Sequence, residues 1–221
     1  MNATMSKIHL ELLDKERRKV FETLSVFKNN GYLAGGTGLA LQINHRRSED
    51  FDIFIDRPVE NKLKLKVEKT FGKVIFSVNT SDQISFKTAE GINITFLWYY
   101  FKPISDFIKT SSLLLASVDD IVADKAQTIG YRAVWRDYVD IFLLLKTEKF
   151  NLKKIIYLGK KKFKGEFIET QFLEQLRYFD DLQIVPVDFT KEKYNDEEIK
   201  NYLQSQVKDY LKKYLRLKNI P

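Results

Sequence analysis

Residues 32–56, YLAGGTGLALQINHRRSEDFDIFID, form the stretch around which the rest of the chain is organised. The stretch opens with residues able to form a short strand, followed by a glycine pair, a threonine and a short helical pattern. A basic cluster and a second apolar run with two aspartates complete it. This order predicts a strand, a glycine turn, a helix and a second strand.

The glycine turn has the composition of a phosphate-binding corner. Two glycines between a strand and a helix let the backbone pack close to a ligand and direct amide groups at an anion. We therefore expect Gly35, Gly36 and Thr37 to cradle phosphates through backbone amides and one hydroxyl.

The two aspartates of the second strand are the strongest chemical signal. Asp50 and Asp52 are two residues apart, so on a strand they project from the same face, and the neighbouring apolar residues point into a core. Those neighbours are Phe51, Ile53 and Ile55. Paired carboxylates in a half-apolar strand are costly unless a positive charge lies between them, and a divalent metal with a nucleoside triphosphate supplies one. The alternative is a solvated strand edge.

Composition narrows the class of protein. The chain has 221 residues, 44% of them hydrophobic, and no cysteine, which excludes disulfides and cysteine-ligated metals. Its formal net charge of +7 favours polyanionic partners such as RNA or an acidic protein, although an ordinary lysine-rich surface would give the same excess. No apolar run reaches the roughly 18 residues of a membrane span, and the first residues lack the apolar core of a signal peptide. We expect a cytoplasmic protein without membrane contact.

The remaining segments predict an α+β fold with a helical C-terminal region. Strands are expected at residues 74–78, 83–88 and 92–101. Helices are expected over residues 7–29, 59–71, 118–131, 134–146, 151–179 and 195–217, with Ser117 and Asp119 as candidate caps.

Two blocks together resemble a known family. The first is Gly35-Gly36-Thr37 followed by HRRSEDFDIF at residues 45–54, and the second spans residues 120–141 with Lys125 and the pair Arg136-Asp137. Both resemble motifs of the AbiEii/AbiGii-type nucleotidyltransferases, a branch of the DNA polymerase β-like superfamily with many toxins of bacterial toxin–antitoxin or phage-defence systems. The resemblance covers roughly residues 30–146. It implies a nucleotidyltransferase-like mixed sheet flanked by helices in residues 1–103, and a helical region in residues 104–221 that completes the active-site cleft.

The resemblance also implies roles for particular residues. Catalytic residues would be Asp50, Asp52, Lys125 and Asp137; nucleotide would be bound by Gly35, Gly36, Thr37, Arg47, Ser48 and Lys125; and Mg²⁺ would be held by Asp50 and Asp52. Lys125 would clamp the triphosphate, although a mid-helix lysine could instead only extend to solvent. Asp137 would orient Lys125 or accept a proton, whereas Asp140 could simply pair with Arg132 or Arg136 on the adjoining turn.

One departure from the superfamily pattern leaves two outcomes open. Active members usually carry a third carboxylate on a later strand, where this chain has Asn93 or Thr95. Either another carboxylate, with Asp137 as the first candidate, completes the site, or metal binding is weakened.

Three functions are consistent with these sequence features. The leading one is a Mg²⁺-dependent enzyme that transfers NMP from an NTP to an RNA, with tRNA among the candidates, or to a protein, acting as a toxin with an antitoxin partner. The second is an inactive module of the same fold that binds nucleotide, RNA or a protein. The third is a plain basic nucleic-acid-binding protein, whose affinity would not depend on Asp50 and Asp52.

Overall fold

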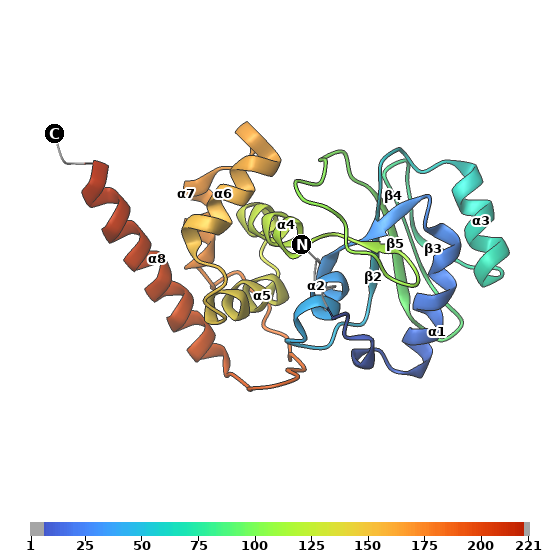
Figure 1. The fold of residues 1–221 in the computed structure, drawn as a ribbon, viewed down its shortest axis with the longest axis horizontal. Helices are drawn as coiled ribbons and strands as arrows, with labels where there is room; N and C mark the ends of the chain where they lie inside the picture. Colours follow the sequence, from blue (N-terminus) through green and yellow to red (C-terminus); the bar gives the residue numbers. More distant parts are fainter. Residues whose placement is uncertain (1–6, 219–221) are drawn as a thin grey trace, which may run out of the picture. The chain divides into compact units, whose positions relative to one another are not determined.

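The computed structural model describes residues 7–218 and divides the chain into two compact units, Met1–Ile121 and Val122–Pro221. Figure 1 shows the strands in the first unit and helices throughout the second. The predicted domain boundary at residue 103 stays a prediction, because compactness does not test which segments fold independently.

A six-stranded mixed sheet forms the frame of the first unit, in the order β3-β4-β5-β2-β1-β6. Its strands are β1 (Gly31–Leu33), β2 (Phe51–Ile55), β3 (Phe76–Asn79), β4 (Gln83–Lys87), β5 (Asn93–Trp98) and β6 (Leu114–Leu115). β2 runs parallel to β5 and β1 parallel to β6, while the other neighbours are antiparallel. The predicted α+β class with a mixed sheet is confirmed.

Three α-helices belong to this unit: α1 (Lys15–Thr23), α2 (Gly35–Ile43) and α3 (Asn61–Phe71). The single helix predicted over residues 7–29 is wrong, because the segment is divided into η1 (Leu10–Leu12), α1 and η2 (Leu24–Phe27). The break has a local cause. Asp14 adopts an extended conformation before α1, and its carboxylate accepts a hydrogen bond from Arg17 N, which starts a new helix at that point.

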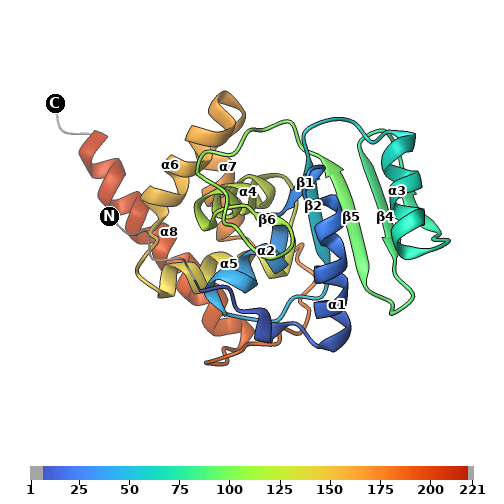
Figure 2. The ribbon, with the colours of Figure 1, turned by 45° about the vertical axis from the view of Figure 1, so that its right-hand side comes forward.

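The sheet has one apolar face and one polar face. Phe51, Ile53 and Ile55 are buried in a single cluster with residues of α1 and α3, so these helices cover that face, as Figure 2 also shows. Asp52 and Phe54 alternate with them and are only partly buried. The predicted alternation of β2 is confirmed, and it places Asp52 on the face away from the core of the unit.

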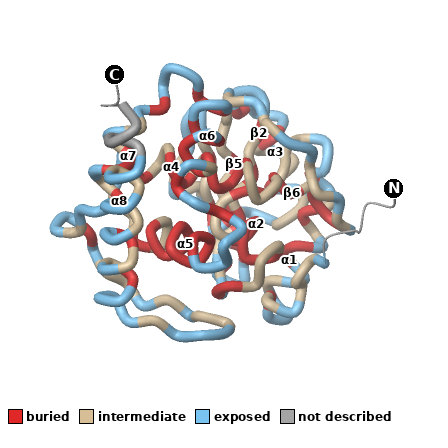
Figure 3. Tube along the Cα trace, turned by 60° about the vertical axis from the view of Figure 1, so that its left-hand side comes forward, coloured by how far each residue is buried: buried red, intermediate tan, exposed pale blue. Residues whose placement is uncertain are grey.

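The second unit consists of helices whose apolar stripes meet. They are α4 (Val118–Tyr131, which begins in the first unit), α5 (Trp135–Lys146), α6 (Leu152–Phe163), η3 (Lys164–Glu166), α7 (Glu169–Leu176) and α8 (Asp196–Lys218). Trp135, Tyr138 and Phe142 of α5 are almost fully buried, and α5 is largely red in the burial view of Figure 3. α8 contributes Ile199 and Leu203, one turn apart.

Two helix predictions in this unit have different outcomes. The helix at 118–131 is confirmed, with Ser117 Oγ accepting a hydrogen bond from Asp120 N at 3.0 Å as its cap. The helix predicted over 151–179 is wrong, because α6 ends before Lys164, which has a positive φ of 52°. Within residues 7–218, none of the helices has both the length and the apolar composition needed to cross a bilayer.

Candidate functional site

The glycine corner lies directly against the second aspartate. Ala34 N donates to Asp52 O at 2.9 Å, which places the end of β1 beside the start of β2. Gly35 follows with a positive φ of 62°, and a Cβ atom there would overlap the Asp52 carboxylate. Only glycine therefore lets the backbone approach this carboxylate so closely. The turn and the acid, separated by sixteen residues of sequence, meet at one place.

The basic segment folds back over the same corner. A Cβ atom on Gly36 would lie 2.8 Å from Arg46 Nη2 and 3.0 Å from Ser48 Oγ. Arg46 is only 3% exposed, and its Nη1 donates to Arg47 O at 2.9 Å. The segment therefore places a buried guanidinium and a hydroxyl over the second glycine.

The Thr37 hydroxyl makes a hydrogen bond within the protein that was not predicted from the sequence. Its hydroxyl donates to the backbone oxygen of Asp50, and the residue is 2% exposed. This bond ties the first turn of α2 to the residue just before β2. Thr37 thus holds the corner and the acid strand together, and its role in phosphate binding stays a prediction.

The strand beside β2 supplies polar but uncharged neighbours to both acids. Asn93 Nδ2 donates to Asp50 Oδ1 at 2.9 Å, and Thr95 is paired with Asp52 in the parallel register of β2 and β5. Thr95 Oγ1 and Ser85 Oγ lie 3.0 Å apart, so the hydroxyl is also engaged across the sheet. Among residues 7–218 there is no group of three His, Cys, Asp or Glu side chains that could hold a metal ion.

The residues present nevertheless fit a magnesium–triphosphate. Mg²⁺ is commonly bound in proteins by one or two carboxylates together with substrate phosphates, and Asp50 and Asp52 are carboxylates of this kind. The missing Cβ atoms of the two glycines let the Asp52 carboxylate and the Arg46 guanidinium lie directly against the backbone of the turn. This buried arginine adds positive charge beside the turn.

A group of packed aromatic rings follows the two aspartates along β2. The Phe54 ring lies 4.4 Å from Tyr99 and 5.9 Å from Tyr32, measured between centroids. Tyr32 in turn lies 4.7 Å from Phe107. Phe54 follows Asp52 on the same face of the strand, so the carboxylates are confined to the N-terminal end of β2.

Lys125 and Asp137 belong to the helical unit, where they form a buried ionic cluster. Lys125 Nζ lies 2.6 Å from Asp137 Oδ1 and 2.7 Å from Asp140 Oδ2. Lys125 is 5% exposed and Asp140 is fully buried. The pairing of Asp140 with Lys125 was not predicted from the sequence, although the i,i+3 spacing of Asp137 and Asp140 places both on one helix face.

The adjoining turn of α5 adds a buried phenol. Tyr138 donates from its hydroxyl to Gln175 O at 3.1 Å, and burial raises the pKa of this tyrosine above its usual value, with Asp181 and Asp137 adding to the shift. Asp137 is therefore held on one side by Lys125 and lies beside a tyrosine that stays protonated. Its predicted role as a base stays a prediction.

Comparisons with solved structures agree with this fold. The crystal structure of a candidate nucleotidyltransferase from H. pylori has a TM-score of 0.57 and 17% identity, covering 93% of this chain and 99% of that one. MenT4, a nucleotidyltransferase toxin from Mycobacterium tuberculosis, has a TM-score of 0.57 and 12% identity, covering 86% of this chain and 80% of its own. The fold is that of the nucleotidyltransferases.

A sequence comparison then identifies the family. The profile described as nucleotidyl transferase AbiEii toxin, type IV toxin–antitoxin system, matches residues 83–219. The chain belongs to this AbiEii nucleotidyltransferase toxin family. An uncharacterized protein of Aquifex aeolicus (strain VF5) is 28% identical over 211 residues, which are 90% of this chain and 98% of that protein.

Proposed function

We propose that the protein is a Mg²⁺-dependent nucleotidyltransferase that transfers NMP from an NTP to an RNA acceptor, with tRNA among the candidates. Family membership supports a transferase of the toxin class. The observation that carries the proposal is the contact between the Gly35 backbone and the Asp52 carboxylate, because a phosphate-binding turn and a metal-binding acid must share one place in such an enzyme.

The proposed reaction joins an acceptor hydroxyl to the α-phosphate. The new P–O bond forms as the bond to the β-phosphate breaks, pyrophosphate leaves, and the hydroxyl proton passes to solvent or a carboxylate. Asp50 and Asp52 would hold Mg²⁺, which when bound supplies activation of the hydroxyl and neutralisation of phosphate charge.

The other residues of the corner would orient the triphosphate. Gly35 and Gly36 present backbone amides, and Ser48 and Arg46 lie over Gly36, where they can donate to phosphate oxygens. Arg47, which follows in the same segment, is exposed and can approach the ligand from solvent. Proteins contribute mainly position and electrostatic stabilisation to phosphoryl chemistry, and these groups supply both.

Lys125 and Asp137 complete the proposal as a nucleotide clamp and its orienting group. The ion pair between them supports the orienting role of Asp137. We further propose an antitoxin partner and a cytoplasmic location, since NTPs and RNA are found there.

A transfer assay with labelled NTPs, Mg²⁺ and bulk cellular RNA tests this function. We expect wild-type protein to label RNA and Asp52→Asn to abolish labelling, since the substitution removes a metal ligand but keeps the side-chain size. The matched control is Asp82→Asn, the same chemical change at an exposed position in the turn between β3 and β4, where the carboxylate accepts a hydrogen bond from Ser81.

Two results would contradict the proposal. One is labelling by Asp52→Asn equal to wild type. The other is nucleotide-dependent thermal stabilisation of wild type without any label transfer to RNA or protein. The second result would favour the inactive binding module, for which the specific observation is the amide of Asn93 and the hydroxyl of Thr95 where the superfamily carries an acid.

A further inference from the structure

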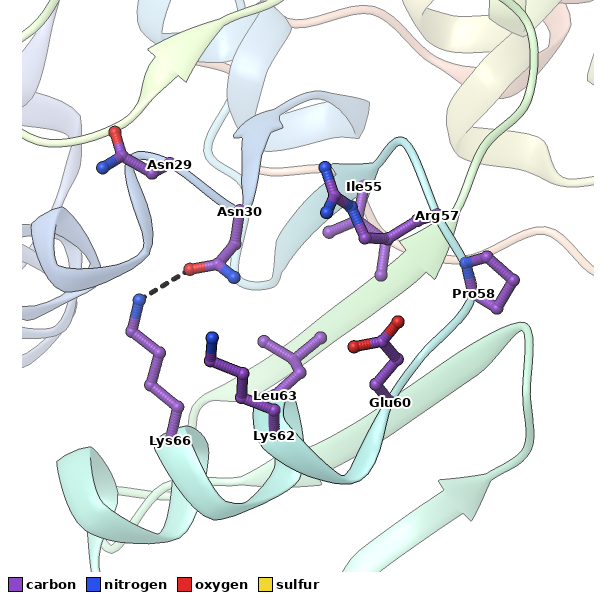
Figure 4. A pocket seen from close by; sticks show the side chains of 9 residues that line it. All are labelled: Asn29, Asn30, Ile55, Arg57, Pro58, Glu60, Lys62, Leu63 and Lys66. Carbon is purple, nitrogen blue, oxygen red and sulfur yellow. Dashed lines mark hydrogen bonds between the residues drawn. The ribbon is translucent and has the colours of Figure 1, made fainter.

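A second polar site lies at the other end of β1 and β2 from the glycine corner. In the register of these strands, Leu33 and Ile53 pair at the end near the corner, while Gly31 and Ile55 pair at the opposite end. A pocket of about 310 Å³ lies at that opposite end (Figure 4). Its size is at the lower end of the range of about 300–1,000 Å³ seen for ligand sites.

Three separate segments bring cationic and amide groups to this pocket. The turn before β1, the segment after β2 and the first two turns of α3 all contribute. The charged and amide residues of the lining are Asn29, Asn30, Arg57, Glu60, Lys62 and Lys66. Ile55, Pro58 and Leu63 form its apolar part. Three cations against one carboxylate make the lining positive.

The hydrogen-bonding state of these groups leaves donors available. Lys66 Nζ donates to Asn30 Oδ1 at 2.7 Å, so the amide oxygen is satisfied and the NH₂ group of Asn30 remains to donate. Within residues 7–218, neither Lys62 nor Lys66 is paired with a carboxylate. Arg57 pairs with Asp56 at 3.0 Å through its Nε atom, and Figure 4 shows its guanidinium beside the pocket.

Glu60 is the single acid of the lining, and its negative charge would oppose the binding of an anion. Figure 4 shows its carboxylate on the same side of α3 as the pocket, at the point where the helix begins. It also helps to raise the pKa of Arg57, after the larger effect of Asp56. An anion in the pocket would therefore be repelled by Glu60 and attracted by Lys62, Lys66 and Arg57.

We propose that this pocket binds a backbone phosphate of the acceptor RNA, away from the nucleotide that reacts. Arginine, lysine and amide donors are the groups that recognise phosphate oxygens. Asp52 and Ile55 are three residues apart on β2, which corresponds to about 10 Å along the strand. A polymer can contact both places, whereas one mononucleotide at the corner cannot fill both. The inference rests on RNA being the acceptor.

Binding of a fluorescently labelled single-stranded RNA across a potassium chloride series tests the inference, measured by anisotropy without NTP. The double variant Lys62→Gln/Lys66→Gln should bind roughly tenfold more weakly, and the slope of log affinity against log salt should fall by about 0.7, the value for one lost phosphate contact. Glu60→Gln should bind more tightly than wild type. The single variant Lys62→Gln is compared with the matched control Lys69→Gln, which makes the same charge change on an exposed part of α3 outside the pocket.

The outcomes separate this inference from the proposed enzyme. Equal affinities and slopes for the double variant and Lys69→Gln would overturn it, as would weaker binding by Glu60→Gln. Displacement of the RNA by inorganic phosphate or ATP at equal ionic strength would show a site for free phosphate and would also overturn it. The anisotropy measurement contains no NTP, so a failure of label transfer in the enzyme assay does not affect the result of the binding test. Lys62→Gln alone repeats the test and leaves the hydrogen bond from Lys66 to Asn30 in place.

Discussion

Gly35 is the residue on which the geometry of the candidate site depends. Its φ of 62° is costly for residues with a side chain. The Asp52 carboxylate lies so close to this backbone that a Cβ atom on residue 35 would overlap it. A side chain here would disturb both the backbone turn and the acid. The geometry of the site therefore depends on a residue that has no side chain with which to contact a ligand.

Gly35→Ala should lower the free energy of unfolding by about 2–4 kcal/mol, combining the strain of a positive φ with overpacking against Asp52. Urea denaturation measures this loss. Gly91→Ala is the matched control, because Gly91 also has a positive φ, of 80°, but no atom lies within 4 Å of the added Cβ. The control should lose only about 1–2 kcal/mol. Equal losses would contradict the close approach.

Lys125 is held by two carboxylates, so its removal has a structural cost as well as the predicted loss of nucleotide affinity. Lys125→Ala leaves Asp140 buried without this cation and should destabilise the protein by about 3–5 kcal/mol. Urea denaturation measures this change. Lys208→Ala, at an exposed position of α8, should change stability by less than about 0.5 kcal/mol.

The double variant Lys125→Ala/Asp140→Asn separates the two effects of Lys125. Replacing the buried acid by an amide should restore part of the lost stability. The nucleotide affinity of this folded variant then tests the clamp, and an affinity equal to wild type would remove Lys125 from nucleotide binding. A single variant that is as stable as wild type would contradict the structural role.

At the scale of elements, the connection between α6 and α7 depends on a close contact with a glycine. A Cβ atom on Gly159 would lie 2.5 Å from the Phe167 ring, which follows η3. The chain therefore has to turn at Lys164–Glu166 to bring Phe167 back onto α6. This contact divides a segment whose apolar pattern predicts one continuous helix.

Gly159→Ala should destabilise the helical unit by about 1–3 kcal/mol, because the ring has to move. Gly130→Ala in α4 is the control: the nearest atoms lie 3.9 Å from its Cβ, an ordinary contact. That variant should gain up to about 1 kcal/mol from the better helix propensity of alanine. Thermal unfolding followed by circular dichroism compares the two, and a loss of stability in both would contradict the packing argument.

At the scale of the whole molecule, metal and nucleotide should stabilise the chain together. Magnesium with the preferred NTP at 100 times its dissociation constant should add about 2.7 kcal/mol to the free energy of unfolding, which raises Tm by several degrees. Chelation of magnesium should remove most of this shift. Asp52→Asn should show little of it, and an equal shift with and without metal would contradict a shared magnesium–triphosphate site.

The net charge of +7 acts at the same scale. It favours RNA as a partner but does not show where RNA binds. The pocket beside α3 is one place where positive charge is concentrated, since three of its lining residues are cationic. Arg57 and Lys62 lie close together in sequence, but no pattern of spacing separates them from the many other surface lysines.

Local pattern was enough to predict the corner. A strand followed by glycines and a helix, and the alternation from Phe51 to Ile55, depend on interactions between near neighbours in the chain, so the sequence by itself determined these elements and the face that carries Asp52. The family motifs pointed to the same class of fold. The first helix was mispredicted, because Asp14 caps α1 within a continuous amphipathic pattern.

Only the tertiary structure decided which distant groups meet. Asn93 beside Asp50, Arg46 over Gly36 and Asp140 against Lys125 all depend on how separate elements pack. The pocket at the far end of β1 and β2 also needs three segments that are brought together by the sheet. The physical reason is that hydrophobic periodicity specifies which face of an element is buried, whereas side-chain contacts depend on strand register and helix packing, which are set by the whole core.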